Sequence, residues 1–166
     1  MLELLIKRRS IRNYQDKDIP FDILLKIIDV ARYAPSGKNR QPWEFIVITE
    51  RSILDKLGAV RQPSSNPLFK ARAAIAVVTD PQASTHLLDG ACATLYLWLA
   101  ATALGLGAVW INPAERKEMY EILRIPKEKH LLSILAIGWP AEQPKEKKLK
   151  KLSEIVHVNY YGNKLK

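Results

Sequence analysis

Five consecutive residues near the start of the chain carry groups that bind phosphate. The segment reads Arg8-Arg9-Ser10-Ile11-Arg12, so three guanidinium groups and one hydroxyl lie close together. In extended chain, residues two positions apart point to the same side, which would bring Ser10 and Arg12 together. Guanidinium groups make charge-assisted, bidentate hydrogen bonds with phosphate oxygens. The segment therefore predicts an anion site, and the alternative interpretation is a basic surface turn at the end of a helix.

Two common nucleotide-binding motifs are absent. Ser36-Gly37-Lys38 lacks both the first glycine and the terminal hydroxyl of a Walker A loop. Gly105-Leu106-Gly107 has Trp110 where the third glycine of the dinucleotide fingerprint belongs, and it precedes an expected strand instead of a helix. A P-loop and a Rossmann site are therefore excluded.

The sequence contains no set of side chains that would form a catalytic centre unaided. The histidines, His86, His130 and His157, do not have the spacing of metal ligands, so no metal site is expected. The single cysteine, Cys92, lies in an apolar run and is expected to be a buried, inert thiol. There is no nucleophile elbow and no Cys–His arrangement.

Strands and helices alternate along the chain, which favours an α/β or α+β layered fold. The hydrophobic periodicity predicts helices over residues 2–9, 20–34, 52–60, 85–104 and 116–123, and strands over residues 43–49, 73–79, 108–111 and 132–138. The strand at 73–79 is made of small and β-branched residues and is expected to be buried on both faces. Polar loops are expected at 35–42 and 62–67.

Length and charge narrow the class of protein. The chain has 166 residues, 48% hydrophobic and 26% charged, which is typical of one soluble domain. Its net charge of +9 is concentrated at the two ends and implies an anionic partner. A basic nucleic-acid-binding module is one alternative, although no helix-turn-helix or RNA-binding motif is present. The first twelve residues do not resemble a signal peptide, and a lone cysteine suits a reducing compartment, so a cytoplasmic location is expected.

The segment from Gly90 to Ala114 carries no charge. It is long enough to span a bilayer, but its glycines and the Asn112-Pro113 pair make helix, turn and strand the better interpretation. A helix over 85–104 that is hydrophobic nearly all round needs cover on every side, and a domain of this size provides that cover with difficulty. We therefore expect a homodimer with residues 89–104 at its centre and no association with a membrane.

Four motifs, in this order, resemble the nitroreductase family of flavoproteins. They are Arg8-Arg9-Ser10-Ile11-Arg12-Asn13-Tyr14, then Ala34-Pro35-Ser36-Gly37-Lys38-Asn39-Arg40-Gln41-Pro42-Trp43, then Asp89 with an Ala-rich helix leading to Gly105-Leu106-Gly107-Ala108-Val109-Trp110-Ile111, and finally Ile137-Gly138-Trp139-Pro140. Their order and spacing cover the chain from residue 2 to about residue 156.

The resemblance implies a single α+β domain over residues 1–166, built as a three-layer sandwich with a mixed or antiparallel central sheet, in an intertwined homodimer. Residues 141–166 would form a charged C-terminal arm. It implies FMN as cofactor and NADH or NADPH as reductant, with a hydride passed through flavin N5 to a nitroaromatic, quinone or similar acceptor by a ping-pong mechanism. The absence of a catalytic centre then has a reason, because the flavin carries the chemistry. A flavin-binding protein without turnover is a further alternative.

The resemblance also assigns roles to residues. Arg8, Arg9 and Ser10 match positions at the FMN phosphate and ribityl chain, and Lys148 and Lys150 match basic residues that complete the phosphate site. Arg12 matches the cation at the flavin pyrimidine edge, where it would stabilise charge on N1 and O2. Pro35, Ser36, Gly37 and Asn39 match a loop that reaches the flavin of the other subunit. Trp110, Ile111 and Asn112 match the segment on the other flavin face, with the Asn112 N–H at N5, and Asn66 matches a flavin-contacting asparagine. Structural roles are the alternatives: a polar turn at 35–39, a core position for Trp110 and a solvated tail for the lysines.

Overall fold

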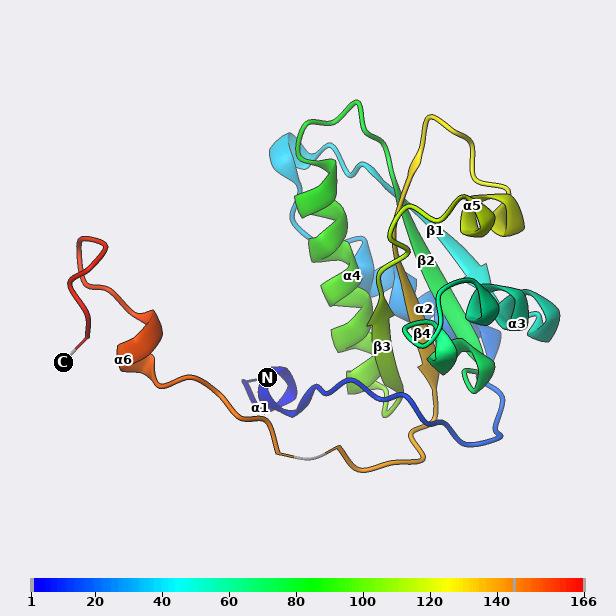
Figure 1. Ribbon diagram of the computed structural model, residues 1–166, viewed down its shortest axis with the longest axis horizontal. Coiled ribbons are helices and arrows are strands. Elements are labelled where there is room, and N and C mark those ends of the chain that lie inside the picture. The colour runs from blue at the N-terminus through cyan, green and yellow to red at the C-terminus, as the bar shows by residue number, and fades with distance from the viewer. Residues whose placement is uncertain (1, 145, 166) are drawn as a thin grey trace.

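The computed structural model describes residues 2–144 and 146–165 (Figure 1). The helices are α1 (Leu2–Lys7), α2 (Phe21–Ala31), α3 (Arg51–Val60), α4 (His86–Ala103), α5 (Lys117–Leu123) and α6 (Leu152–Ile155). The strands are β1 (Trp43–Ile48), β2 (Ala73–Thr79), β3 (Gly107–Ile111) and β4 (His130–Gly138). Single 3-10 turns, η1 (Gly37–Asn39) and η2 (Asn66–Phe69), interrupt the two segments expected to be polar loops. The order of elements predicted from the sequence is confirmed.

The four strands form one sheet in the order β1-β2-β4-β3, and every neighbouring pair is antiparallel. The chain after α1 runs along the outer side of β3, where Ser10 forms a parallel bridge with Ala108 and the Ile11 N–H donates to the Ala108 carbonyl (3.0 Å). The basic segment at 8–12 is therefore attached to the edge of the sheet.

Helices cover both faces of the sheet, which makes the three layers of the predicted sandwich. The core on one face includes Leu24 and Ile27 of α2 and Leu97 of α4. The core on the other face includes Leu57 of α3 and Met119 of α5. Figure 1 shows α4 on one side of the sheet and α3 and α5 on the other. All residues of β2 are buried, as predicted for a central strand with two covered faces.

Helix α4 approaches the sheet closely and ends where the sequence predicts. A Cβ on Gly90 would lie 2.5 Å from Leu132 Cδ2 and 2.6 Å from Thr79 Cγ2, so a larger residue would push the helix away from the sheet. After Ala103 the chain turns at Gly105, whose positive φ of 79° favours glycine, and the Leu106 N–H donates back to the Ala101 carbonyl (2.9 Å).

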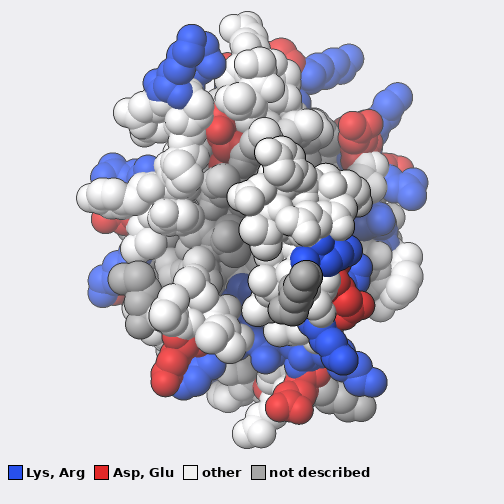
Figure 2. Space-filling view, turned by 90° about the vertical axis from the view of Figure 1, so that its left-hand side faces the viewer, with Lys and Arg blue, Asp and Glu red and all other residues white. Residues whose placement is uncertain are grey.

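The outer side of α4 carries an apolar stripe. Leu88, Cys92, Leu95 and Leu99 recur at helical spacing, and all of them are exposed or only half-buried. Cys92 is half-buried at the edge of this stripe, where it packs against the core, so the prediction of a buried Cys92 was wrong for the single chain. Figure 2 looks from this side, with the C-terminal arm toward the viewer, and shows mostly uncharged surface across its middle, with most Lys, Arg, Asp and Glu side chains toward the margin. Among the described residues, no helix is both long and apolar enough to cross a membrane.

Beyond Pro140 the chain leaves the sheet as an arm that contains α6 (Figure 1). Most of its large apolar side chains are exposed; these are Leu149, Leu152, Ile155, Val158, Tyr160, Tyr161 and Leu165. An arm of this kind buries little apolar surface within its own chain, so it contributes little to the stability of the isolated chain.

Candidate active site

A cavity of about 530 Å³ lies between the end of β3, the segment after α1 and the turn that joins α3 to η2. Its lining is Arg12, Asn13, Arg61, Pro63, Ser64, Asn66, Pro67, Lys70, Val109, Trp110, Ile111 and Asn112. Five of the residues proposed from sequence therefore meet here, namely Arg12, Asn66, Trp110, Ile111 and Asn112. They come from three separate parts of the chain, which the fold brings together.

The lining of this cavity is cationic. Arg12, Arg61 and Lys70 contribute three positive charges, and the residues that line it include no aspartate or glutamate. A negative charge inside the cavity would lie close to these three cations and be stabilised by them, so the site favours a ligand with negative or developing negative charge. Sequence reasoning missed Arg61 and Lys70.

Arg61 also shapes the segment after β3. Its Nη1 donates to the Asn112 carbonyl (2.9 Å), and Asn112 Oδ1 accepts the Ala114 N–H (2.8 Å). The second bond forms a turn in which the side chain binds backbone two residues further on. The backbone carbonyl and the side-chain oxygen of Asn112 are thereby both hydrogen-bonded, which fixes the backbone from Trp110 to Asn112 along the cavity.

Glu142 supports the opposite wall of the cavity. Its Oε1 accepts the N–H of Arg12 (2.5 Å) and of Asn13 (3.1 Å), and its Oε2 accepts from Asn13 Nδ2 (2.7 Å). Asn13 Oδ1 in turn accepts from Lys70 Nζ (2.7 Å). The hydrogen bond from the Arg12 N–H, with those from Asn13, lowers the pKa of Glu142, which keeps it ionised at neutral pH. Sequence reasoning missed Glu142 and Asn13 as well.

Arg8 and Ser10 lie on the same segment after α1 as Arg12 but do not line the cavity. The Arg8 guanidinium lies over the Trp98 ring, with Cζ 4.2 Å from the ring centroid. Its Nη1 is buried and has no hydrogen-bond acceptor among the described residues. Burial, followed by the nearby charge of Arg9, lowers the pKa of Arg8. Arg9 instead donates to the Arg8 carbonyl (3.0 Å), so its guanidinium is engaged with backbone at the end of α1.

The loop with Pro35, Ser36, Gly37 and Asn39 lies at the other end of α4. The Gly37 N–H donates to Asp89 Oδ1 (3.1 Å), and Ser36 Oγ accepts the Gln41 N–H (3.0 Å). A Cβ on Gly37 would lie 2.8 Å from Thr85 Oγ1, so the close approach needs glycine. Asp89 lies near the N-terminal end of α4, whereas Trp98, whose ring the Arg8 guanidinium covers, lies in the C-terminal half. One chain therefore does not bring this loop together with the basic segment.

Lys148 and Lys150 lie on the exposed arm before α6. Figure 1 shows that part of the chain leading away from the sheet, so a single chain does not place these lysines beside the cavity. The groups predicted to surround one ligand are thus divided among three places: the cavity with its basic segment, the loop at 35–39, and the arm.

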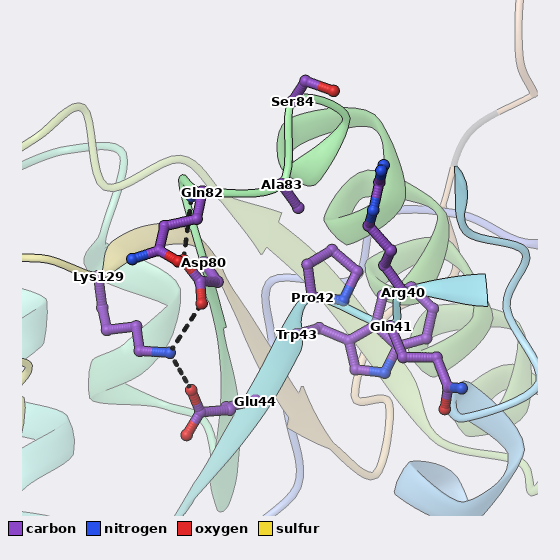
Figure 3. A pocket seen from close by; sticks show the side chains of 10 residues that line it. All are labelled: Arg40, Gln41, Pro42, Trp43, Glu44, Asp80, Gln82, Ala83, Ser84 and Lys129. Atoms are coloured by element: carbon purple, nitrogen blue, oxygen red, sulfur yellow. Dashed lines mark hydrogen bonds and ion pairs between the residues drawn. The ribbon is translucent and has the colours of Figure 1, made fainter. Parts of the chain in front are cut away.

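A second cavity of about 470 Å³ contains none of the proposed site residues. Lys129 Nζ pairs with Glu44 Oε1 (2.8 Å) and lies 3.6 Å from Asp80 Oδ2. Figure 3 shows Lys129 between these carboxylates, with Arg40 and Trp43 across the hollow. Its main charges already neutralise one another, and we do not consider it the active site. The described residues also contain no cluster of three or more potential metal ligands from His, Cys, Asp or Glu.

Comparison with known proteins and family models shows the family of the chain. The model of the nitroreductase family matches residues 5–63 and 59–139. The chain belongs to the nitroreductase family. The family and the α+β fold inferred from the four sequence motifs are both confirmed.

Relatives in this family cover nearly the whole chain. A protein of Archaeoglobus fulgidus with a provisional NADH dehydrogenase/NAD(P)H nitroreductase name is 36% identical over 151 residues, which are 86% of each chain. The structure of an FMN-dependent nitroreductase from Clostridium difficile has a TM-score of 0.90 and 32% identity, and the match covers 97% of this chain and 100% of that chain. An iodotyrosine deiodinase from Thermotoga neapolitana is 25% identical over 171 residues, 89% of this chain and 91% of the relative. Different reactions thus occur among nitroreductase-family relatives of similar length.

Proposed function

We propose that this nitroreductase-family protein is an FMN-dependent oxidoreductase that takes a hydride from NADH or NADPH and passes it to a small acceptor such as a nitroaromatic or a quinone. The observation that carries the proposal is the cavity in which Arg12, Arg61 and Lys70 face the end of β3 without a carboxylate in the lining. When bound, FMN would supply the hydride-accepting centre, which this chain's side chains do not provide.

The cavity fits the pyrimidine edge of a flavin. Reduction places negative charge on that edge, and cations already in position stabilise the charge as it develops. Arg12 and Lys70 would hold this edge from one wall, and Asn66 would contact it from η2. Trp110 and Ile111 would pack against one flavin face, and the Asn112 N–H would donate to N5.

The phosphate end of the cofactor fits the segment around Arg8. A buried guanidinium N–H without an acceptor costs free energy unless a ligand accepts its hydrogen bond. Ser10 adds a hydroxyl, and Arg9 would turn from the α1 carbonyls toward the phosphate. Lys148 or Lys150 would complete the phosphate site from the arm.

A second copy of the chain would complete the site in this proposal. Its loop at Pro35, Ser36, Gly37 and Asn39 would reach the flavin held by the first copy, because the same loop lies too far along α4 to do so in its own chain. The exposed apolar stripe of α4 would provide the dimer interface. Reductant and acceptor would then occupy in turn the open face of the cavity.

The colour of the purified protein is the first test. A yellow protein whose blue absorbance bleaches when NADH or NADPH is added under nitrogen, and returns when a quinone or nitroaromatic is supplied, supports the proposal. Bleaching also separates an enzyme from a flavin-binding protein without turnover. Colourless protein that cannot be reconstituted with FMN would contradict the proposal, and nucleic-acid binding would then be the alternative to examine.

Arg12→Ala tests the role of the cation at the pyrimidine edge. At saturating FMN, we expect the rate of flavin reduction to fall about tenfold or more, since a preplaced charge acts mainly on the state in which charge develops. Arg40→Ala, which removes an exposed arginine from the second cavity, is the control and should reduce at the wild-type rate. Stopped-flow bleaching measures both. An Arg12→Ala protein that binds FMN weakly but reduces normally when saturated would show that the assignment is wrong.

A further inference from the structure

We infer that Glu142 is a positioning residue that sets the orientation of the Asn13 amide and thereby holds Lys70, together with Arg12, at the cationic wall of the cavity. The inference rests on the proposed function for the identity of the ligand. Glu142 itself does not line the cavity, so it acts on the ligand only through its neighbours.

Backbone pairing places Glu142 beside Arg12. The Gln15 N–H donates to the Trp139 carbonyl (2.8 Å), and the Ala141 N–H donates to the Asn13 carbonyl (3.0 Å). Tyr14 and Pro140 form an antiparallel bridge between the same two segments. The chain leaving β4 therefore lies along the segment after α1, and the next residue, Glu142, reaches the N–H groups of Arg12 and Asn13.

The carboxylate determines which way the Asn13 amide faces. An ionised carboxylate only accepts hydrogen bonds, so it must face the NH₂ side of the amide, and the bond from Nδ2 to Glu142 Oε2 is 2.7 Å. Oδ1 is then left to face Lys70 Nζ at 2.7 Å. If the amide turned over, its NH₂ group would meet the Lys70 ammonium, donor against donor. A carboxylate at 142 therefore favours the orientation in which Asn13 can accept from Lys70.

The same carboxylate fixes Arg12 from behind. It accepts from the Arg12 backbone N–H, and Arg12 lines the cavity. The arrangement uses one negative charge to orient two cations while keeping that charge out of the lining. Reduced FMN is more negative at the pyrimidine edge than oxidised FMN. The affinity for reduced FMN should therefore depend on Glu142 more strongly than the affinity for oxidised FMN does.

The test compares Glu142→Gln, Lys70→Met, the double variant and a control, Glu146→Gln, which removes a carboxylate from an exposed position further along the arm. Dissociation constants are measured anaerobically for oxidised and for reduced FMN. We expect Glu142→Gln to weaken the binding of reduced FMN about fivefold more than that of oxidised FMN, which is the size of one ordinary hydrogen bond. The double variant should lose less affinity for FMN than the product of the two single fold-losses, because both changes break the same hydrogen-bond network. Glu146→Gln should behave as wild type.

A second measurement does not depend on flavin. In flavin-free protein labelled with ¹⁵N, the side-chain amide resonances of Asn13 should move in Glu142→Gln and in Lys70→Met and stay in place in Glu146→Gln. Unmoved Asn13 resonances, equal weakening of both redox states of FMN, or losses that multiply in the double variant would each overturn the role of Glu142. If no variant and no wild-type protein bound FMN, the proposed function would fail, and the amide resonances would still decide whether Glu142 orients Asn13.

Discussion

Arg8 shows how a single side chain is prepared for a ligand. Its guanidinium lies 4.2 Å from the Trp98 centroid, a contact that satisfies part of the charge but accepts no hydrogen bond. Nη1 remains buried without an acceptor in the described chain, and burial lowers the pKa of the group. A charged donor held this way gains more from an anionic ligand than a solvated one does, because much of its desolvation has already occurred.

Arg8→Gln should therefore weaken FMN but not riboflavin, which lacks the phosphate. Loss of a charge-assisted hydrogen bond of about 1.5 to 3 kcal/mol predicts a fall of about 10- to 100-fold in FMN affinity. Arg32→Gln is the matched control, because this arginine follows the last residue of α2, is exposed and pairs with Asp29. Quenching of flavin fluorescence measures both ligands. If Arg8→Gln weakened riboflavin as much as FMN, Arg8 would have a structural role instead.

At the scale of elements, two glycines allow the segment after α1 to lie flat on the sheet. A Cβ on Gly107 would lie 2.7 Å from Ile11 Cβ, and a Cβ on Gly138 would lie 2.6 Å from ring atoms of Tyr14. The Tyr14 hydroxyl donates to the Ile11 carbonyl (2.6 Å), which ties the segment to itself. Because Ser10 and Arg12 belong to this segment, the glycines of β3 and β4 help to determine where the predicted phosphate and pyrimidine groups lie.

Gly138→Ala should destabilise the protein and weaken FMN together. The added methyl group meets the rigid Tyr14 ring, and overpacking of this kind costs about 1 to 3 kcal/mol. Gly58→Ala is the control: its Cβ would also press on a ring, that of Phe69 at 3.0 Å, but this ring is 38% exposed and can move, and alanine favours the α3 helix. Urea unfolding gives the free energies, and FMN titration gives the second readout. A Gly138→Ala protein as stable as wild type would show that the segment after α1 can shift on the sheet without loss of stability.

At the scale of the whole molecule, the proposed ligand groups are distributed over both ends of α4. The basic segment packs near Trp98, and the loop at 35–39 binds Asp89 at the other end. Between them the helix exposes apolar side chains, with Leu88 71% and Leu95 44% exposed. Exposed apolar surface of this kind marks an interaction site, and a second copy would cover it while supplying the missing loop.

Leu95→Glu should therefore dissociate the proposed dimer, since burying a charge at an apolar interface costs free energy. It should also weaken FMN binding at least tenfold, because the partner subunit would no longer supply its loop to the site. Ala59→Glu adds the same charge to an exposed position on α3, in the opposite layer, and should do neither. Sedimentation velocity gives the mass and flavin titration the affinity. A wild-type protein that is monomeric and still binds FMN would refute the role of α4.

The elements of this protein follow largely from the sequence alone, because periodicity, prolines and glycines act over a few residues. Local patterns therefore predicted the four strands, the order of the helices and, through four short motifs, the family. The residues that shape the cavity could not be found in this way. Glu142 meets Arg12 across 130 positions, Lys70 meets Asn13 across 57 and Arg61 meets Asn112 across 51. Such contacts depend on how segments pack after the sheet has formed. Only the tertiary structure therefore added Arg61, Lys70 and Glu142 to Arg12 around the cavity and showed that α4 separates the two halves of the proposed site.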